Sequence, residues 1–145
     1  MMAGTLVAFD FGAKRLGVAV GETSTGIASP LTTIAAEANA ARFAAIDRIV
    51  SEWHPAGFVV GRPKHSDGSQ HAVALLAEKF ARRLAARFKC PVAFVDETLT
   101  SALAESELAM HGTRARRQGD VDALAATMIL QSFLDDPAAH EPLAS

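Results

Sequence analysis

The stretch that decides the fold is Thr5-Leu-Val-Ala-Phe-Asp10-Phe-Gly-Ala-Lys14-Arg-Leu-Gly17-Val-Ala-Val-Gly21. Two apolar runs flank a short connection that contains Gly12, and this pattern predicts an antiparallel β-hairpin. In the first run both strand faces are apolar except at Asp10, which indicates a central strand in a sheet covered on both sides. A carboxylate there needs a partner, because burying a charge is costly. The partner is either a cation or the backbone amides of a strand-end turn.

The second run has one face made only of small residues, namely Gly17, Ala19 and Gly21. Because bulky side chains are absent there, another backbone or a ligand can approach this face of the strand closely. The sequence leaves both possibilities open.

The composition is that of an ordinary globular protein, with 145 residues of which 50% are hydrophobic and 21% are charged. This length predicts one domain over residues 1–137, followed by a flexible C-terminal tail over 138–145. The single cysteine, Cys90, excludes an intrachain disulfide and a thiol cluster for zinc, and it fits a reducing compartment. The sequence shows neither a secretory signal nor an apolar run of membrane-spanning length, so we expect a cytoplasmic protein without a membrane partner.

The overall charge does not by itself indicate a nucleic-acid partner, because the formal net charge is −2. Basic residues nevertheless gather in two places, over residues 82–89 and 114–117. Such clusters are either phosphate contacts or solvated surfaces.

Periodicity predicts the remaining elements. Strands are expected over 26–34, where Pro30 indicates an edge, and over 57–61 and 92–95, and helices over 38–53, 68–88, 98–110 and 121–134. In the first of these helices we expect Arg42 to face solvent, and in the second we expect Leu76 to be buried. A helix between two strands implies a crossover, so the sheet should be mixed and the fold α/β.

Three carboxylates stand at comparable places in these elements. Asp10 lies near the end of the first strand, Glu97 follows the strand over 92–95, and Asp122 is in the first turn of the last helix. Sites in open α/β sheets form at strand ends, and an all-oxygen pocket there suits Mg²⁺ or Mn²⁺. Two such ions about 4 Å apart activate water and stabilise the leaving oxygen in phosphodiester cleavage. Each acid also has a structural alternative: Asp122 complements a helix N-terminus, and Glu97 is a solvated strand end.

Four motifs occur in a fixed order along the chain: Asp10-Phe-Gly-x-Lys-Arg-x-Gly-Val-Ala19, Val60-Gly61-x-Pro63 with Asp67-Gly68, Asp96-Glu97-x-Leu99-Thr100-Ser101, and Asp122-x-x-Ala125-Ala126-x-x-Ile129-Leu130. Together they closely resemble the YqgF family of pre-16S rRNA nucleases, which are relatives of Holliday junction resolvases. The resemblance covers about residues 5–134. It implies a ribonuclease H-like α/β fold with helices on both faces of a five-stranded mixed sheet of order 3-2-1-4-5. The third and second strands are then antiparallel to their neighbours.

The resemblance also implies divalent-metal nuclease activity on structured nucleic acid, with Asp10, Glu97 and Asp122 as the catalytic, metal-binding acids. Two departures remove positive charge beside this site: Thr98 stands where the family usually has arginine, and Asp120 stands where it usually has a basic residue. We expect Arg62 and Lys64 to restore some of this positive charge, and Lys14 and Arg15 to lie close enough to the acids to bind the substrate backbone.

The function that follows from the resemblance is a Mg²⁺- or Mn²⁺-dependent endonuclease that processes the 5′ end of pre-16S rRNA, acting as a monomer or a homodimer. Two alternatives remain. One is a resolvase of branched DNA that uses the same site, for which dimerisation would place two sites about a two-fold axis. The other is a nucleic-acid-binding adaptor of the same fold with little catalysis.

Overall fold

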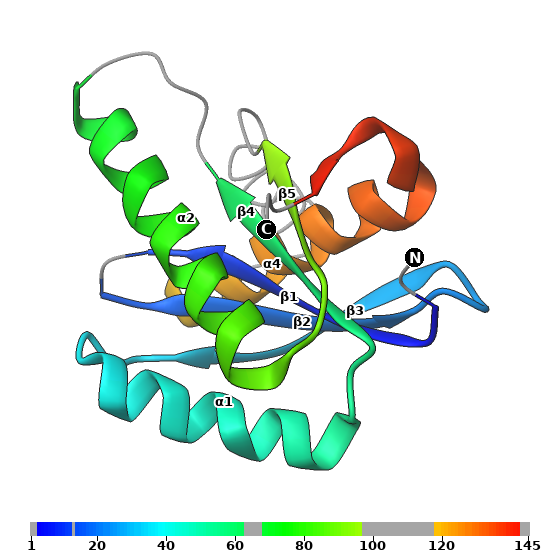
Figure 1. Ribbon diagram of the computed structural model, residues 1–145, viewed down its shortest axis with the longest axis horizontal. Coiled ribbons are helices and arrows are strands. Elements are labelled where there is room, and N and C mark those ends of the chain that lie inside the picture. The colour runs from blue at the N-terminus through cyan, green and yellow to red at the C-terminus, as the bar shows by residue number, and fades with distance from the viewer. Residues whose placement is uncertain (1–2, 13, 63–67, 97–117, 143–145) are drawn as a thin grey trace.

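The computed structural model describes residues 3–12, 14–62, 68–96 and 118–142. Its strands form one sheet of order β3-β2-β1-β4-β5-β6 (Figure 1). The strands are β1 (Thr5–Phe11), β2 (Leu16–Glu22), β3 (Ile27–Ile34), β4 (Gly57–Arg62), β5 (Val92–Asp96) and β6 (Glu141–Pro142). Strand β2 is antiparallel to both β1 and β3, whereas β4 is parallel to both β1 and β5. The predicted hairpin, the mixed sheet and the order 3-2-1-4-5 are therefore confirmed.

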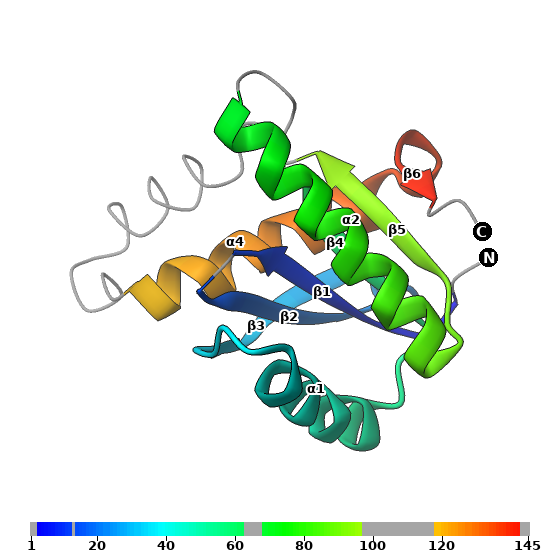
Figure 2. The same cartoon turned by 60° about the vertical axis from the view of Figure 1, so that its left-hand side comes forward.

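Helices cover both faces of the sheet, as predicted. Helices α1 (Asn39–Trp53) and α2 (Gly68–Phe88) lie on one face, and α4 (Gln118–Asp135) crosses the other (Figures 1 and 2). The helix predicted over 98–110 lies outside the described residues. No helix in the described part of the chain is long and apolar enough to cross a membrane.

The end of the chain contains two short elements after α4. A short 3-10 helix, η1 (Pro137–Ala139), is followed by β6, which pairs antiparallel with β5 through Phe94↔Glu141 and Ala93↔Pro142. A two-residue strand carries no periodicity that a sequence pattern could detect, and Pro142 is tolerated because β6 is an edge strand.

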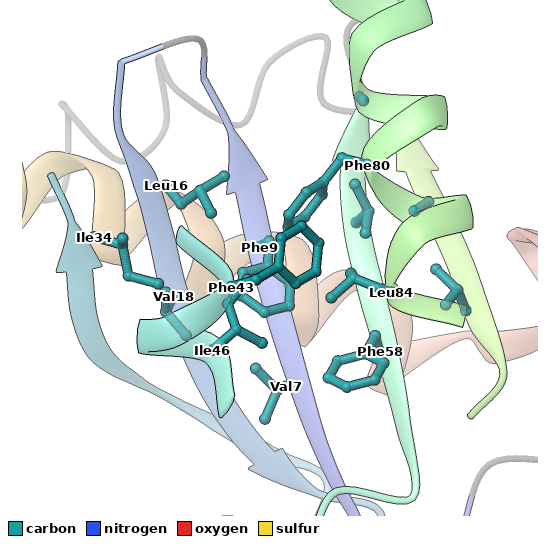
Figure 3. Packing of buried hydrophobic residues seen from close by; sticks show 14 of the residues in the cluster. Val7, Phe9, Leu16, Val18, Ile34, Phe43, Ile46, Phe58, Phe80 and Leu84 are labelled. Atoms are coloured by element: carbon teal, nitrogen blue, oxygen red, sulfur yellow. The ribbon is translucent and has the colours of Figure 1, made fainter. Parts of the chain in front are cut away.

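The protein has two hydrophobic cores, one on each face of the sheet, between the strands and the helices that cover them. On the α1 and α2 side, Phe9, Phe43, Phe58 and Phe80 form an aromatic cluster, in which the rings of Phe9 and Phe80 meet edge to face with centroids 5.4 Å apart (Figure 3). On the α4 side, the core combines alanines, including Ala8, Ala19 and Ala126, with larger aliphatic side chains of the sheet and the helix. The alternation of β1 thus directs Leu6, Ala8 and Asp10 toward the α4 side.

Two expectations about the helices were wrong. Arg42 is buried, with an exposed fraction of 3%, because its guanidinium donates hydrogen bonds to two backbone carbonyls instead of facing water. Leu76 is 47% exposed, because α2 packs on the sheet through a narrower stripe of mostly small residues. That stripe consists of Ala74, Ala77, Phe80, Ala81 and Leu84.

Candidate functional site

A pocket of about 330 Å³ lies where β1 ends and the turn to β2 begins. Its described lining consists of Asp10, Phe11, Gly12, Lys14, Arg15 and Asp122. Two of the three predicted acids therefore share one pocket with two of the four predicted basic residues. The acids come from opposite ends of the chain, so the site exists only when α4 is docked on the sheet.

The position of Asp10 follows from the sheet register. Asp10 pairs with Gly17 of β2 on one side and with Gly61 of β4 on the other. Since neither neighbour has a side chain, nothing on the adjacent strands competes with the carboxylate for the space over the sheet. The side chain of Asp10 lies at the pocket end of the α4 side.

The position of Asp122 depends on Gly17. A Cβ atom built on Gly17 would lie 1.9 Å from the carbonyl oxygen of Asp122 and 3.1 Å from the backbone nitrogen of Ala123. The first turn of α4 therefore rests directly on the backbone of β2, beside the tip of the hairpin (Figure 2). The close approach predicted for this strand face is confirmed, and the approaching group is a backbone. Because Gly17 is also the register partner of Asp10, it brings the two acids together.

Arg15 links the hairpin to α4 by an ion pair. Its Nε donates to Oδ2 of Asp122 across 2.8 Å, and the two side chains are 41% and 14% exposed, respectively. The pocket contains two acidic and two basic side chains, so its formal charges balance; these are Asp10, Asp122, Lys14 and Arg15. A pair that is this sheltered on the carboxylate side is screened less by salt than a pair in open solvent.

Arg62 lies on the other side of the sheet from the two acids. It follows Phe58 and Val60 in the alternation of β4, and both of these pack on the α1 and α2 side. Its guanidinium forms ion pairs with Glu78 at 3.1 Å and with Asp96 at 3.4 Å.

The same guanidinium lies 4.5 Å from the centroid of the Phe94 ring. With its side chain 12% exposed, Arg62 is held at the end of β4 by acids and by an aromatic face. Its predicted contact with substrate remains a prediction.

The remaining predicted residues, Glu97, Lys64 and Thr98, lie outside the described residues, as does the side chain of Asp120. Within the described residues, no group of three or more His, Cys, Asp or Glu side chains is placed to hold a metal ion. The donors that do meet, the carboxylates of Asp10 and Asp122, are the hard oxygen ligands that Mg²⁺ and Mn²⁺ prefer.

Sequence reasoning missed one residue that contacts the site. The Nη2 of Arg42, on α1, donates a hydrogen bond of 2.5 Å to the carbonyl oxygen of Gly12 in the pocket wall. Helical periodicity alone assigns Arg42 to solvent, and no motif in the sequence marks it.

Comparison with known proteins gives a consistent family assignment. The model of the family described as "RuvX: Holliday junction resolvase" matches residues 4–136. The chain is 52% identical over 135 residues to the "Putative pre-16S rRNA nuclease" of Dechloromonas aromatica, with 92% of each chain covered. Proteins of the same name are 52% identical in Thiobacillus denitrificans, covering 91% of this chain and 92% of that one, and 46% identical in Neisseria gonorrhoeae, covering 91% and 88%.

Solved structures share the architecture at low sequence identity. "T. thermophilus RuvC in complex with Holliday junction substrate" superposes with a TM-score of 0.61 at 17% identity, covering 97% of this chain and 99% of that one. "Thermus thermophilus RuvC structure" gives a TM-score of 0.52 at 17% identity, covering 96% and 99%. At this identity the likeness establishes the fold alone, which is the RuvC-like, ribonuclease H-like fold that the motifs implied.

Proposed function

The chain belongs to the RuvX family, and on that premise we propose that it is a divalent-metal-dependent endonuclease that processes the 5′ end of pre-16S rRNA. The names of its curated relatives support the substrate. The observation that carries the chemistry is the meeting of Asp10 and Asp122 in one pocket. We expect the protein to work in the cytoplasm, where its substrate is made.

The acids of the pocket fit a hard cation. In the proposal Asp10 and Asp122 each offer carboxylate oxygens to Mg²⁺ or Mn²⁺, and Glu97, which follows β5, supplies the third carboxylate. When bound, such an ion would activate water and stabilise the leaving oxygen in phosphodiester cleavage. Carboxylates suit this work because their hard oxygens are the ligands that Mg²⁺ and Mn²⁺ prefer.

The basic residues of the pocket would hold the phosphate backbone. Lys14 is exposed at the pocket wall, and Arg15 keeps 41% of its side chain in solvent while it pairs with Asp122. The planar guanidinium of Arg15 can donate two hydrogen bonds to one phosphate, whereas Lys14 acts as a compact point charge. Arg62 and Lys64 are proposed as further contacts near β4. Arg62 would have to share its guanidinium between phosphate and the carboxylates of Glu78 and Asp96.

The proposal is tested by incubating the purified protein with pre-16S rRNA in Mg²⁺, Mn²⁺ or EDTA. We expect Asp10→Asn to abolish cleavage and to leave thermal unfolding almost unchanged, because the substitution conserves shape and removes only the charge. Asp136→Asn is the matched control, since Asp136 is an exposed carboxylate beyond α4. Retained cleavage together with a large loss of stability would show that Asp10 is a structural residue.

A second candidate, a resolvase of four-way DNA junctions, is favoured by the description of the matching family. It would use the same acids, and preferential cleavage of junction DNA over pre-16S rRNA would decide for it. A dimer in solution would add support, because paired symmetric cuts need two sites related by a two-fold axis. RNA binding that survives Asp10→Asn, without any metal-dependent product from the wild type, would instead identify an adaptor.

A further inference from the structure

Arg42 is a buried cation that bonds to backbone carbonyls. Its Nη2 donates to the carbonyl oxygen of Gly12, and its Nε donates to that of Ala36, both at 2.5 Å. The guanidinium carbon lies 5.5 Å from the centroid of the Phe11 ring. One side chain on α1 therefore ties together the segment that precedes the helix and the turn that follows β1.

This arrangement is energetically demanding. Burial lowers the pKa of Arg42 from its ordinary value, and the charge of Glu37 offsets this only in part. In the described part of the chain, no carboxylate lies within ion-pair distance of Arg42. An apolar side chain of similar size commonly serves stability at least as well as a buried charge. Stability alone thus gives little reason for an arginine at this position.

The carbonyl that Arg42 holds belongs to the candidate site. Gly12 lines the pocket together with Asp10 and Arg15. A Cβ atom at Gly12 would lie 2.7 Å from the carbonyl oxygen of Arg15, so the backbones of these two residues approach each other closely. A displacement of the Gly12 carbonyl would therefore be passed on to Arg15 through backbone contact.

The turn is held from both sides of the sheet. On the α1 and α2 side, Phe11 packs against the core and neighbours both Arg42 and the ring of Phe80, whose centroid is 5.4 Å from that of Phe11. On the α4 side, Arg15 is paired with Asp122 at 2.8 Å. Arg42 supplies the hydrogen bond on the first side, and Asp122 supplies the ion pair on the second.

We propose that Arg42 is a positioning residue of the site: by anchoring the Gly12 carbonyl it holds Asp10 and Arg15 in register with Asp122. The proposal rests on the proposed function, because it assigns Arg42 to the geometry of the same acids. Arg42 touches neither substrate nor metal in this account. It acts through its hydrogen bond to the backbone of Gly12, whereas the outer partners of metal ligands in other proteins bond to the ligands themselves.

The first test measures Mn²⁺ binding alone, by electron paramagnetic resonance, for the wild type and for Arg42→Met. Methionine keeps the apolar volume and removes both hydrogen bonds. Outer-shell partners of metal ligands contribute about 10- to 100-fold to metal affinity, so we expect a loss in this range. In cleavage assays kcat should fall by a larger factor than KM for RNA rises, since both acids lose their mutual position whereas Lys14 keeps its phosphate contact. Arg42→Lys, which can restore one donor, should recover part of both losses.

Two control variants on α1 separate this role from a general one. Arg48→Met removes an exposed positive charge from the same helix, and Ile46→Val weakens the core beside Arg42 without touching the turn. Both should keep the Mn²⁺ affinity and kcat of the wild type, although Ile46→Val unfolds at a lower temperature. Metal affinity that follows unfolding temperature across all four variants would overturn the proposal, because Arg42 would then be only a structural residue.

A second readout does not require metal or cleavage. The side-chain Nε–H of Arg15 should give a distinct NMR signal because it is bonded to Asp122, and Arg87, whose Nε bonds to Asp47 at 3.0 Å, provides an internal reference. We expect Arg42→Met to shift or broaden the Arg15 signal and to leave the Arg87 signal in place. An unchanged Arg15 signal would refute the proposal that Arg42 positions Arg15 through the Gly12 carbonyl. If wild-type protein neither binds Mn²⁺ nor cuts RNA, the proposed function fails, and this signal still decides the role of Arg42.

Discussion

Replacement of Gly17 by alanine should damage the site through the backbone. The added Cβ would lie 1.9 Å from the carbonyl oxygen of Asp122, whereas ordinary contact begins at 3.4 Å. The atoms that this Cβ would meet belong to the backbone of α4, which cannot rotate away as the end of a side chain can. The first turn of α4 must therefore move outward by about 1.5 Å, and Asp122 moves with it.

The size of the effect follows from this displacement. Overpacking of this kind costs about 1–3 kcal/mol. In a chain of this length, each kcal/mol lowers the melting temperature by about 2–4 °C, so we expect a fall of roughly 2–12 °C. A misplacement of about 1 Å in a catalytic group costs on the order of 10²-fold in rate, and we expect at least that loss of RNA cleavage.

The assay compares Gly17→Ala with Gly21→Ala in thermal unfolding and in cleavage of pre-16S rRNA. A Cβ at Gly21 would meet the carbonyl oxygen of Ile27 at 2.9 Å and side-chain atoms of Leu130 and Leu134 at 3.0 and 3.1 Å. This control also strains the face under α4, but it lies about 13 Å along β2 from Gly17. It should lose stability and keep activity. A Gly17→Ala protein with wild-type unfolding and cleavage would refute the close packing of α4 on β2.

Three further predictions follow from the ion pairs. Arg15→Gln should raise Mn²⁺ affinity in a calorimetric titration, since Asp122 no longer shares its carboxylate with a guanidinium, and should lower RNA affinity; unchanged affinity for both would separate Arg15 from the site. Arg62→Ala should weaken RNA binding and reduce the slope of log affinity against log salt by about 1, and an unchanged slope would remove Arg62 from the RNA interface. The hydrogen bond from Arg87 lowers the pKa of Asp47, so this pair stabilises the fold above the unfolded pKa of about 4 and loses that effect as pH falls through the folded pKa. Asp47→Asn should thus unfold at a lower temperature than the wild type at pH 7 and at the same temperature near pH 2, and a difference that persists at pH 2 would contradict this account.

The strands of the sheet could be predicted from the sequence because each strand has a recognisable pattern of its own. The hairpin is predicted by the alternation of its strands and by its short turn, and β4 and β5 are predicted by their continuous apolar runs. Each of these patterns is complete within a few residues. The close approach at Gly17 could also be predicted from the sequence, because a strand face with only small residues leaves space that another group must fill. Residues alone left the roles of Asp10 and Asp122 undecided, and the ordered motifs of the family were needed to connect them.

Other features depend on tertiary contacts that no short window contains. Arg42 has the helical position of a solvent-facing residue, and only the neighbouring carbonyls of Ala36 and Gly12 explain its burial. Leu76 is exposed because alanines on α2 bring the helix close to the sheet along a different stripe. The strand β6 forms because β5 leaves an edge beside it. Each of these outcomes was decided by a partner distant in sequence.

The ion pair between Arg15 and Asp122 spans 107 positions of the chain, which has a consequence for biosynthesis. A ribosome that is making this protein has already released the whole hairpin, with Asp10 in it, long before Asp122 is translated. Domains begin to fold from the N-terminal side during synthesis, so most of the sheet can form while the chain is still growing. A growing polypeptide that still lacks α4 therefore cannot bring Asp10 and Asp122 into one pocket, so the proposed site assembles only after α4 has been translated.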